Sequence, residues 1–297
     1  MEQIEIKDTS TFVRYVSEIG SQIKRKQFFY NWELLYRGQS NVSYEIIPSI
    51  ARDYNGKTSP LLHHERELIE SVMVQFPDMF KVEYEPVEVL ALLQHFGMPT
   101  RLLDVTENAL VGLYFACLGD AKNDGEVFVF KQDETNIRVK YLTEAIADSY
   151  RFIDSESAYL ETFFGQIKDQ PYYLEAKHMT ELSQSSTKDG ANWLKHYAIS
   201  PIFIQARIHS MRQRMQAGRY IIFPNTIAYE DEQDVFLREI APIPKNHESI
   251  VGRAIVKGNA KQKILQELAA LGISKRTLFP DNIDIVCDEI KNAFLRL

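Results

Sequence analysis

Cysteine, long apolar stretches and excess positive charge are scarce in this sequence, and each shortage removes a class of protein. The 297 residues include two cysteines, Cys117 and Cys287, each in an apolar helical pattern. Two distant thiols cannot form a cysteine-based zinc site, so buried reduced thiols are expected. No apolar run approaches the roughly 20 residues that span a bilayer, and residues 1–12 lack the features of a secretory signal. We therefore expect a soluble, cytoplasmic protein without membrane contact.

The charge balance argues against a general nucleic-acid coat. The net charge is -7, whereas proteins of that kind neutralise many phosphates with Lys and Arg. Two local clusters are cationic, at residues 24–26 and 207–219, and such clusters are usually solvated faces. With 45% hydrophobic and 25% charged residues, the composition is that of an ordinary globular protein. The length fits one large domain or two closely packed ones.

Apolar periodicity and helix-capping or turn residues predict a chain of mixed helices and strands. The predicted helices cover residues 8–29 (capped by Thr9 or Ser10), 61–80, 86–96, 108–118, 260–271 and 283–297. The predicted strands cover residues 33–38, 125–130, 201–208, 219–223 and 236–243. The region 134–200 is harder to interpret: helices are expected around 141–150 and 157–164, and an exposed loop, the place for any lid, at 183–190.

Three short stretches combine residues that suit ligand binding. In the first, Arg37 ends an apolar strand and Gly38 allows a close backbone approach. The planar guanidinium of arginine suits a phosphate or a carboxylate, because it donates two parallel charge-assisted hydrogen bonds. The alternative is a buried arginine paired with an acid such as Asp104.

The second stretch runs from Gln94 to Leu110, where a short strand leads into a helix. It carries Arg101, Asp104 and Thr106, and the helix cap is Thr106 or Asn108. Free backbone N–H groups at such a junction are a recurrent site for polar ligands. The alternative is that Asp104 or Thr106 only caps the helix while His95 packs beneath it.

The third stretch, residues 215–223, is a turn entering an apolar strand. Gly218 permits a close backbone approach, and Gln216 stands beside it. A plain hairpin entry is the alternative.

Taken together, these stretches resemble successive motifs of the FRG-domain family. The resemblance spans residues 33–290, and its longest motif is the second stretch. It is carried by Tyr36 to Ser40, Ile47 to Arg52, Gln94 to Asp104, Ala109 to Ala116, Gln216 to Gly218 and Leu278 to Asp281. Members of this family are associated with toxin and phage-defence contexts.

A looser resemblance is to ADP-ribosyltransferases of the Arg-Ser-Glu type. Arg37 matches the arginine that holds NAD phosphate, and residues 103–106 resemble the second motif, with Thr106 keeping a hydroxyl. Residues 216–218 resemble the third motif, with Gln216 or Gly218 where the catalytic glutamate should stand. The resemblance implies an α+β fold: an ADP-ribosyltransferase-like split β-sheet core with flanking helices. It also implies a helical extension at residues 1–32 and a domain at 33–297 with a helical insertion around 134–200.

The same resemblance implies roles for individual residues. Arg37 grips NAD phosphate, Gln39 or Thr106 contacts nicotinamide or ribose, and Tyr114 or Phe115 stacks on a ring. Because the glutamate is missing, Asp104 is the preferred acid, and Glu230 or Glu232 are more distant alternatives. The implied catalytic set is Arg37, Asp104 and Gln216. The implied NAD-binding set is Tyr36, Arg37, Gly38, Gln39, Arg101, Thr106, Tyr114 and Phe115.

The function that follows is an NAD-dependent ADP-ribosyltransferase-like toxin of a bacterial toxin–antitoxin or phage-defence system. NAD is its substrate, the acceptor is RNA, DNA or protein, and an antitoxin protein is a candidate partner. The alternative is a non-catalytic module that recognises a nucleotide or a phage component, with Arg37 and Arg101 holding phosphate. A metal-dependent nuclease is disfavoured, because His63 and His64 lack convincing partner ligands and residues 230–234 suit a solvated loop. No metal site is expected.

Overall fold

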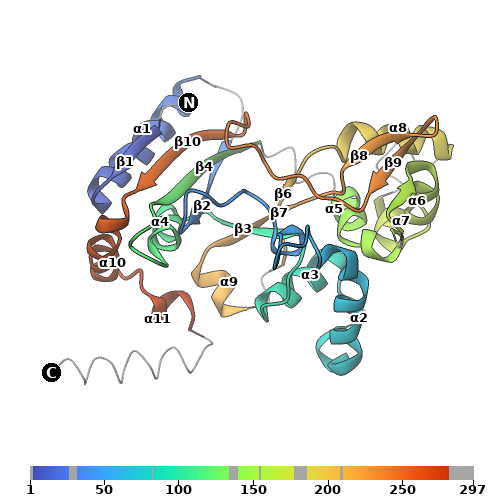
Figure 1. Cartoon of the computed structure of the whole chain (residues 1–297), viewed down its shortest axis with the longest axis horizontal. Helices are drawn as coiled ribbons and strands as arrows, with labels where there is room; N and C mark the ends of the chain where they lie inside the picture. Colours follow the sequence, from blue (N-terminus) through green and yellow to red (C-terminus); the bar gives the residue numbers. More distant parts are fainter. Residues whose placement is uncertain are drawn as a thin grey trace.

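A seven-stranded mixed sheet forms the centre of this α+β protein (Figure 1). The computed structural model describes residues 3–26, 32–81, 83–133, 140–153, 155–176, 186–207 and 210–280. The strands, in their order across the sheet, are β1 (Gln3–Ile6), β10 (Ile250–Val256), β4 (Gly125–Asp133), β2 (Trp32–Gln39), β3 (Leu102–Thr106), β7 (Gly218–Ile222) and β6 (Ile202–Ile204). The β1–β10 pair is parallel, and the other neighbours are antiparallel.

The sheet opens between β2 and β3. All of β2 pairs with β4, from Trp32 opposite Asp133 to Gln39 opposite Glu126. In contrast, β2 meets β3 at Tyr36 opposite Thr106. The two strands therefore diverge on either side of this pair, and backbone and side-chain groups near the centre of the sheet remain accessible.

One face of the sheet is covered by α1 (Thr9–Lys26), α4 (Ala109–Cys117) and α10 (Lys261–Ala270). We call it the α4 face. Tyr36, Val127 and Val129 point to this face, as their alternation along the strands requires. The helix α4 lies very close to β2, because a Cβ atom added to Gly38 would sit 1.9 Å from the carbonyl oxygen of Gly112. Gly38 is thus needed for this helix–strand packing.

The opposite face packs against irregular segments. Leu35, Leu103, Phe128 and Phe130 lie there, and chain segments 46–62 and 240–243 cover them. Short 3-10 helices occur in these and other connections: η1 (Ser49–Ala51), η2 (Leu62–His64), η3 (Pro77–Met79), η5 (Ser149–Arg151) and η8 (Gly258–Ala260).

A second body of helices continues the core beyond β3 and β7. It contains α2 (Glu65–Gln75), α3 (Pro86–His95), α5 (Lys140–Ala147), α6 (Leu160–Ile167), α7 (Pro171–Ala176) and α8 (Thr187–Tyr197). A three-stranded sheet of β5 (Ser157–Tyr159), β9 (Gln233–Leu237) and β8 (Ile227–Glu230) packs with them (Figure 1). Its core reaches Leu102, Tyr220 and Ile222. Two short helices remain, α9 (Met211–Met215) and α11 (Lys275–Leu278).

Several predicted elements are confirmed. The helix predicted at 86–96 is α3, with Pro86 in its first turn, and the helix predicted at 108–118 is α4. Asn108 is the cap of α4: its side-chain oxygen accepts a hydrogen bond from the backbone N–H of Leu110 at 2.9 Å. The helix predicted at 260–271 is α10, and Gly272 follows it with a positive φ of 84°.

Other predictions are wrong. The cap of α1 is Asp8, which accepts a hydrogen bond from the backbone N–H of Thr11 at 2.8 Å, so Thr9 and Ser10 are not needed for it. Residues 157–159 form a strand instead of the start of a helix, because they pair with β9. Residues 187–190 begin α8 rather than a loop, since Ser186 caps that helix. The strands β1, β8 and β10 were not predicted, and the strand expected at 236–243 ends at Leu237.

Some expectations fall outside the described residues, including the helix at 283–297 with Cys287 and the loop residues 183–185. Residues 3–26 join the main sheet through β1 and pack on it through α1, while the boundary between residues 32 and 33 stays a prediction. Among the described residues, no helix combines the length and the apolarity needed to cross a bilayer.

Candidate functional site

A cavity of about 250 Å³ lies where the sheet opens between β2 and β3. Its floor is the α4 face of β3 and β7, where Asp104 and Tyr220 are register partners. Its walls come from α4 on one side and from α3 and α9 on the other. The lining residues are Tyr36, Arg37, Gly38, Gln94, His95, Asp104, Val105, Thr106, Phe115, Ser210, Arg212, Gln213, Gln216, Gly218 and Tyr220. Segments far apart in the sequence therefore share one concave site.

Arg37 is held at the opening between the two strands. Its Nη1 donates a hydrogen bond to the backbone carbonyl of Asp104 at 2.7 Å, and its Nε donates to the side-chain oxygen of Gln39 at 3.4 Å. Gln39 is itself buried and donates to the carbonyl of Tyr44 at 3.1 Å. Burial lowers the pKa of Arg37 to about 10, Asp104 opposes this shift, and Arg52 adds to it. The guanidinium stays protonated at neutral pH and is fixed in orientation.

Asp104 is the acid among the cavity-lining residues. Its side chain is exposed, and within the described part of the chain its carboxylate accepts no hydrogen bond and forms no ion pair. The contact from Arg37 goes to the backbone oxygen of Asp104, so the two side chains do not form the buried pair considered from the sequence. The charge of this carboxylate still acts on Arg37, Arg52 and Tyr220. It is therefore available to a ligand.

Thr106 and Gln216 connect the second and third sequence stretches. The Thr106 hydroxyl donates to the Gln216 carbonyl at 2.6 Å and accepts from the Asn108 backbone N–H at 3.0 Å. The Gln216 side-chain amide donates to the Leu278 carbonyl at 3.0 Å. Because these bonds use the Thr106 hydroxyl as both donor and acceptor, its role in the structure is to hold the cavity wall.

The turn before β7 places its unusual backbone at Ala217 rather than at Gly218. Ala217 has a positive φ of 45°, which L-residues adopt at a cost of about 1 kcal/mol or more. Its carbonyl accepts a hydrogen bond from the Glu107 backbone N–H at 3.0 Å. A Cβ atom added to Gly218 would lie 3.3 Å from the Gln213 carbonyl. Gly218 therefore serves the approach of α9, and the same is true of Gly38 and α4.

Aromatic groups complete the cavity. Phe115 lines it and meets Phe279 edge to face, with 6.3 Å between ring centroids. Tyr220 is 6% exposed, and burial raises the pKa of its hydroxyl, with a further increase from Asp104 and an opposing effect of Arg212. Tyr114, which the sequence suggested for ring stacking, is not among the lining residues and packs in the core beneath α4.

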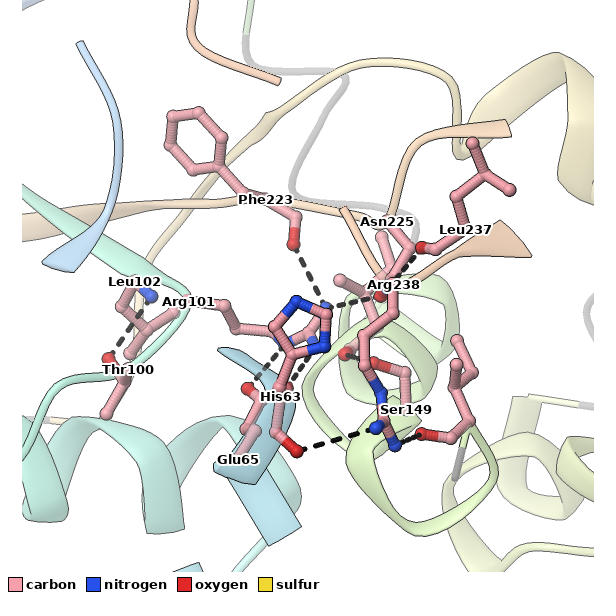
Figure 2. A network of polar contacts seen from close by, with 12 residues as sticks. His63, Glu65, Thr100, Arg101, Leu102, Ser149, Phe223, Asn225, Leu237 and Arg238 are labelled. Carbon is pink, nitrogen blue, oxygen red and sulfur yellow. Dashed lines mark hydrogen bonds and ion pairs between the residues drawn. The ribbon is translucent and has the colours of Figure 1, made fainter. Parts of the chain in front are cut away.

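Arg101 lies outside this cavity, in a buried polar network (Figure 2). It is 1% exposed, and its guanidinium forms a two-pronged ion pair with Glu65. It also donates to the side chain of Asn225 at 3.0 Å and to the carbonyl of Phe223 at 3.3 Å. A desolvated cation is stable only when it is paired in this way. Arg101 thus holds β3 to α2 and to the segment after β7, and it is not placed to contact a ligand in the cavity.

The structure separates the remaining candidates as well. Glu230 and Glu232 belong to the β8–β9 turn of the small sheet and do not line the cavity. Cavity residues that were not proposed from the sequence are Gln94, His95, Ser210, Arg212, Gln213 and Tyr220. Gln94 and His95 stood in the second stretch, Tyr220 in the third, and Ser210, Arg212 and Gln213 in the cationic cluster at 207–219. The position of Tyr220 depends on the β3–β7 register, which no local signal gives.

Within the described residues, no group of three or more His, Cys, Asp or Glu side chains is arranged to hold a metal ion. The cavity instead presents a fixed guanidinium, an uncommitted carboxylate and aromatic rings. Such a set suits an organic anion with a ring.

The fold and the cavity define a mixed α+β protein with a polar, partly cationic site at an opening in its central sheet. The model of one family, the FRG domain, matches residues 32–125, about a third of the chain. The match begins at β2 and ends at the first residue of β4, so it contains Arg37 and Asp104, whereas Arg212, Gln216 and Tyr220 lie beyond it. Neither the curated proteins nor the solved structures include a match to this chain.

Proposed function

We propose that the protein is an NAD-consuming ADP-ribosyltransferase-like enzyme whose site is the cavity between β2 and β3. One observation carries the proposal: Arg37 and Asp104 both line the cavity, beside Phe115 and Tyr220, and the Arg37 guanidinium is held at the backbone of Asp104, whose carboxylate is uncommitted. Splitting NAD requires a cation for the diphosphate and a negative charge near the ribose, and both are present here. We also propose that the central sheet, which opens between β2 and β3, corresponds to the split β-sheet core of this enzyme class.

The size of the cavity suggests how NAD would bind. At about 250 Å³ it is slightly smaller than the roughly 300–1,000 Å³ typical of pockets for drug-sized ligands. It would take the nicotinamide and its ribose, with the diphosphate against Arg37 and the adenosine towards solvent. Arg212 supplies a second cation in the lining, and Phe115 an aromatic surface for the nicotinamide ring.

In the proposed reaction, the bond between the nicotinamide nitrogen and ribose C1′ breaks. The electron pair leaves with nitrogen and gives neutral nicotinamide, and positive charge develops on C1′ and the ring oxygen. The Asp104 carboxylate stabilises this charge, because an oriented anion in a partly desolvated site stabilises a cationic transition state. A nucleophilic oxygen or nitrogen of the acceptor then bonds to C1′ and releases its proton to Asp104 or to water.

Gln216 has a separate role in the proposal. Its amide nitrogen is bound to the Leu278 carbonyl, and its side-chain oxygen accepts no hydrogen bond from the described residues. This oxygen would orient a ribose hydroxyl or the acceptor. It cannot replace the charge of the missing glutamate, and for that reason the acid is assigned to Asp104.

Nicotinamide release from NAD tests the proposal. Asp104→Asn keeps the shape and removes the charge, so we expect the rate to fall about 100-fold or more. Arg37→Ala should reduce kcat/KM about 10- to 100-fold by removing a charge-assisted phosphate contact. The matched controls are Asp169→Asn and Arg14→Ala, at exposed positions of other elements, and both should leave the rate unchanged. Equal rates in the wild type and the Arg37→Ala variant would refute the proposal.

A non-catalytic ligand-binding module is the second candidate function. It is favoured by one observation: the third sequence stretch presents no acid, and its Gln216 is tied to Leu278. This function predicts that NAD or another nucleotide raises the melting temperature without being consumed. Incubation with NAD followed by separation of nicotinamide distinguishes the two candidates.

The biological setting of the proposal is a toxin of a toxin–antitoxin or phage-defence system. It rests on the family resemblance and not on any single residue. Expression of the wild type should then arrest growth, and Asp104→Asn should not. An antitoxin would be recognised as a co-expressed protein that restores growth.

A further inference from the structure

Two short helices beside the cavity carry a concentration of positive charge. Arg212 and Arg214 belong to α9, and Lys275 and Arg276 belong to α11. The helices are joined by contacts between their ends: the Gln216 amide donates to the Leu278 carbonyl at 3.0 Å, and the Arg212 guanidinium lies 4.7 Å from the centre of the Phe279 ring. We call these four cationic residues, with Phe279, the α9–α11 surface.

Most of this charge is not neutralised by neighbours. Arg214, Lys275 and Arg276 are exposed, and none of them forms an ion pair with another residue that the structure describes. By contrast, Arg219 pairs with Glu33 and Glu107, and Lys257 pairs with Glu5 and Asp124. In a chain of net charge -7, uncompensated cations on two adjoining helices create a local positive potential.

The surface is continuous with the cavity. Ser210, Arg212 and Gln213 line the cavity from the side of α9, while Arg37 lines it from β2. Arg52 lies near enough to shift the pKa of Arg37 downwards. A polyanion that follows the α9–α11 surface would therefore pass the mouth of the site at Asp104.

The side chains favour nucleic acid over an acidic protein. Arginine matches the geometry of a phosphate with its planar fork. Phe279 is partly exposed, and the Arg212 guanidinium lies over its ring; a base can stack on a guanidinium plane held in this way. The exposed apolar groups on α9 are Met211 and Met215, and these two do not form the packed apolar centre that protein interfaces use.

The cavity also selects a single strand. A duplex keeps its bases stacked and paired inside the helix, and an enzyme reaches a base only after it is turned out of the stack. A recess of about 250 Å³ admits one such unit and not a duplex. We propose that the acceptor is a single-stranded nucleic acid, which the α9–α11 surface holds by its phosphates while one nucleotide approaches the cavity. The inference rests on the proposed function for the transfer step, but not for the binding step.

Binding is measured by fluorescence anisotropy with labelled single-stranded RNA and DNA of about 12 nucleotides. The test variant is Arg214→Glu/Lys275→Glu/Arg276→Glu. The control with the same charge change is Arg14→Glu/Lys168→Glu/Lys188→Glu, at positions on α1, directly after α6 and on α8. At 0.1 M salt, loss of three phosphate contacts should weaken binding about 100-fold and reduce the slope of log K against log salt by about 2. The control variant should bind only slightly more weakly than the wild type, because its net charge alone is changed.

A neutral variant, Arg214→Gln/Lys275→Gln/Arg276→Gln, shows whether weaker binding could result from misfolding of the charge-reversed variant. It should keep the wild-type melting temperature and still bind about 10-fold or more weakly. Equal affinity of the wild type and both α9–α11 variants overturns the inference. So does polyglutamate that displaces RNA as well as unlabelled RNA does, because the surface would then recognise acidic protein. Duplex binding equal to that of the single strand overturns the choice of strand.

The two proposals fail in different ways. Nicotinamide release without nucleic acid should be the same in the wild type and the neutral variant, because Asp104 and Arg37 are intact. With labelled NAD, label in RNA or DNA that is lost in the neutral variant supports the inference. Label in protein alone overturns it while the NAD reaction stands. Tight binding of the single strand without any NAD consumption supports the surface and overturns the reaction.

Discussion

Two arginines show how little of a residue's role is visible in its immediate sequence. Arg37 and Arg101 both stand at the edge of a short apolar strand within the same family match. In the structure Arg37 lines the cavity, whereas Arg101 is enclosed between Glu65 and Asn225. Glu65 lies on α2, and the packing of α2 beside β3 gives Arg101 a buried acidic partner that Arg37 does not have. The sequence could therefore place a functional arginine in this region without separating the two.

Arg101 should behave as a structural residue. Arg101→Ala leaves Glu65 as an unpaired buried charge, so we expect a loss of about 3–5 kcal/mol in the free energy of unfolding. Chemical denaturation measures it. The double change Arg101→Met/Glu65→Leu removes both charges and should recover much of the loss. If Arg101→Ala stays as stable as the wild type and instead weakens NAD binding, its assignment to the core is incorrect.

Asp148 makes stability depend on pH at a second buried site. Burial raises the pKa of this carboxyl to about 6, while Arg151 and the Tyr172 hydroxyl oppose the shift. The folded state then binds the proton more tightly than the unfolded state. Below about pH 4 the carboxyl is protonated in both states and does not change the free energy of unfolding. As pH rises from about 4 to about 6, the free energy of unfolding falls, and the destabilisation is complete above that range.

Asp148→Asn removes that cost. Relative to the wild type, the variant should gain about 3 kcal/mol of stability between pH 4 and pH 7. Urea unfolding at several pH values gives the difference. Asp169→Asn, an exposed control, should show no such trend. A difference that is constant with pH would mean that Asp148 titrates normally.

At the scale of elements, the contact between β2 and α4 leaves no room for a side chain at Gly38. A Cβ atom at Gly38 would meet backbone atoms of Gly112 and Ala116, which cannot move aside as a flexible side chain can. Gly38→Ala should cost about 3 kcal/mol or more by overpacking. It should also reduce any activity of the cavity, because α4 carries Phe115.

The control is Gly165→Ala in α6. Its added Cβ would lie 3.8 Å from the Thr187 methyl group, which is an ordinary van der Waals distance. Alanine is the better helix former, so this change should be neutral or stabilise by up to about 1 kcal/mol. Thermal melting of both variants provides the comparison. Equal melting temperatures would show that β2 and α4 separate easily.

Elements defined by local pattern were predicted well, and those defined by distant partners were not. The caps and periodicity of α3 and α4 lie within their own residues, and the apolar run of β2 ends at its turn. In contrast, β1 and β10 acquire their roles from a parallel pairing of residues about 250 positions apart. The polar start of α8 looks like a loop until Ser186 is seen to cap it.

At the scale of the whole molecule, the N-terminal segment is part of the central core. Ile6 and Phe12 are fully buried against the α4 face, although they precede the family match. Phe12→Ala should cost about 3–5 kcal/mol. If residues 3–26 and the sheet unfold together, denaturation followed by fluorescence and by circular dichroism will give coincident curves. Separate transitions would make this segment an independent extension.

The candidate site could be predicted in part, because some of its residues stand in local motifs and others depend on distant partners. Arg37, Asp104, Thr106 and Gln216 were all named from motifs, and the structure brings them to one cavity. Tyr220 was missed because its place follows from the pairing of β7 with β3. Arg212 was recognised as part of a basic segment, but its position over Phe279 depends on a chain segment far from it in sequence.

The bonds that join Thr106 to Gln216 and Gln216 to Leu278 also set an order in time. A chain emerging from the ribosome presents the whole family match long before β7, α9 and α11 exist. During that interval Arg37 and Asp104 have no Tyr220 beneath them and no Arg212 beside them. The cavity is therefore complete only when the last of these segments has been made.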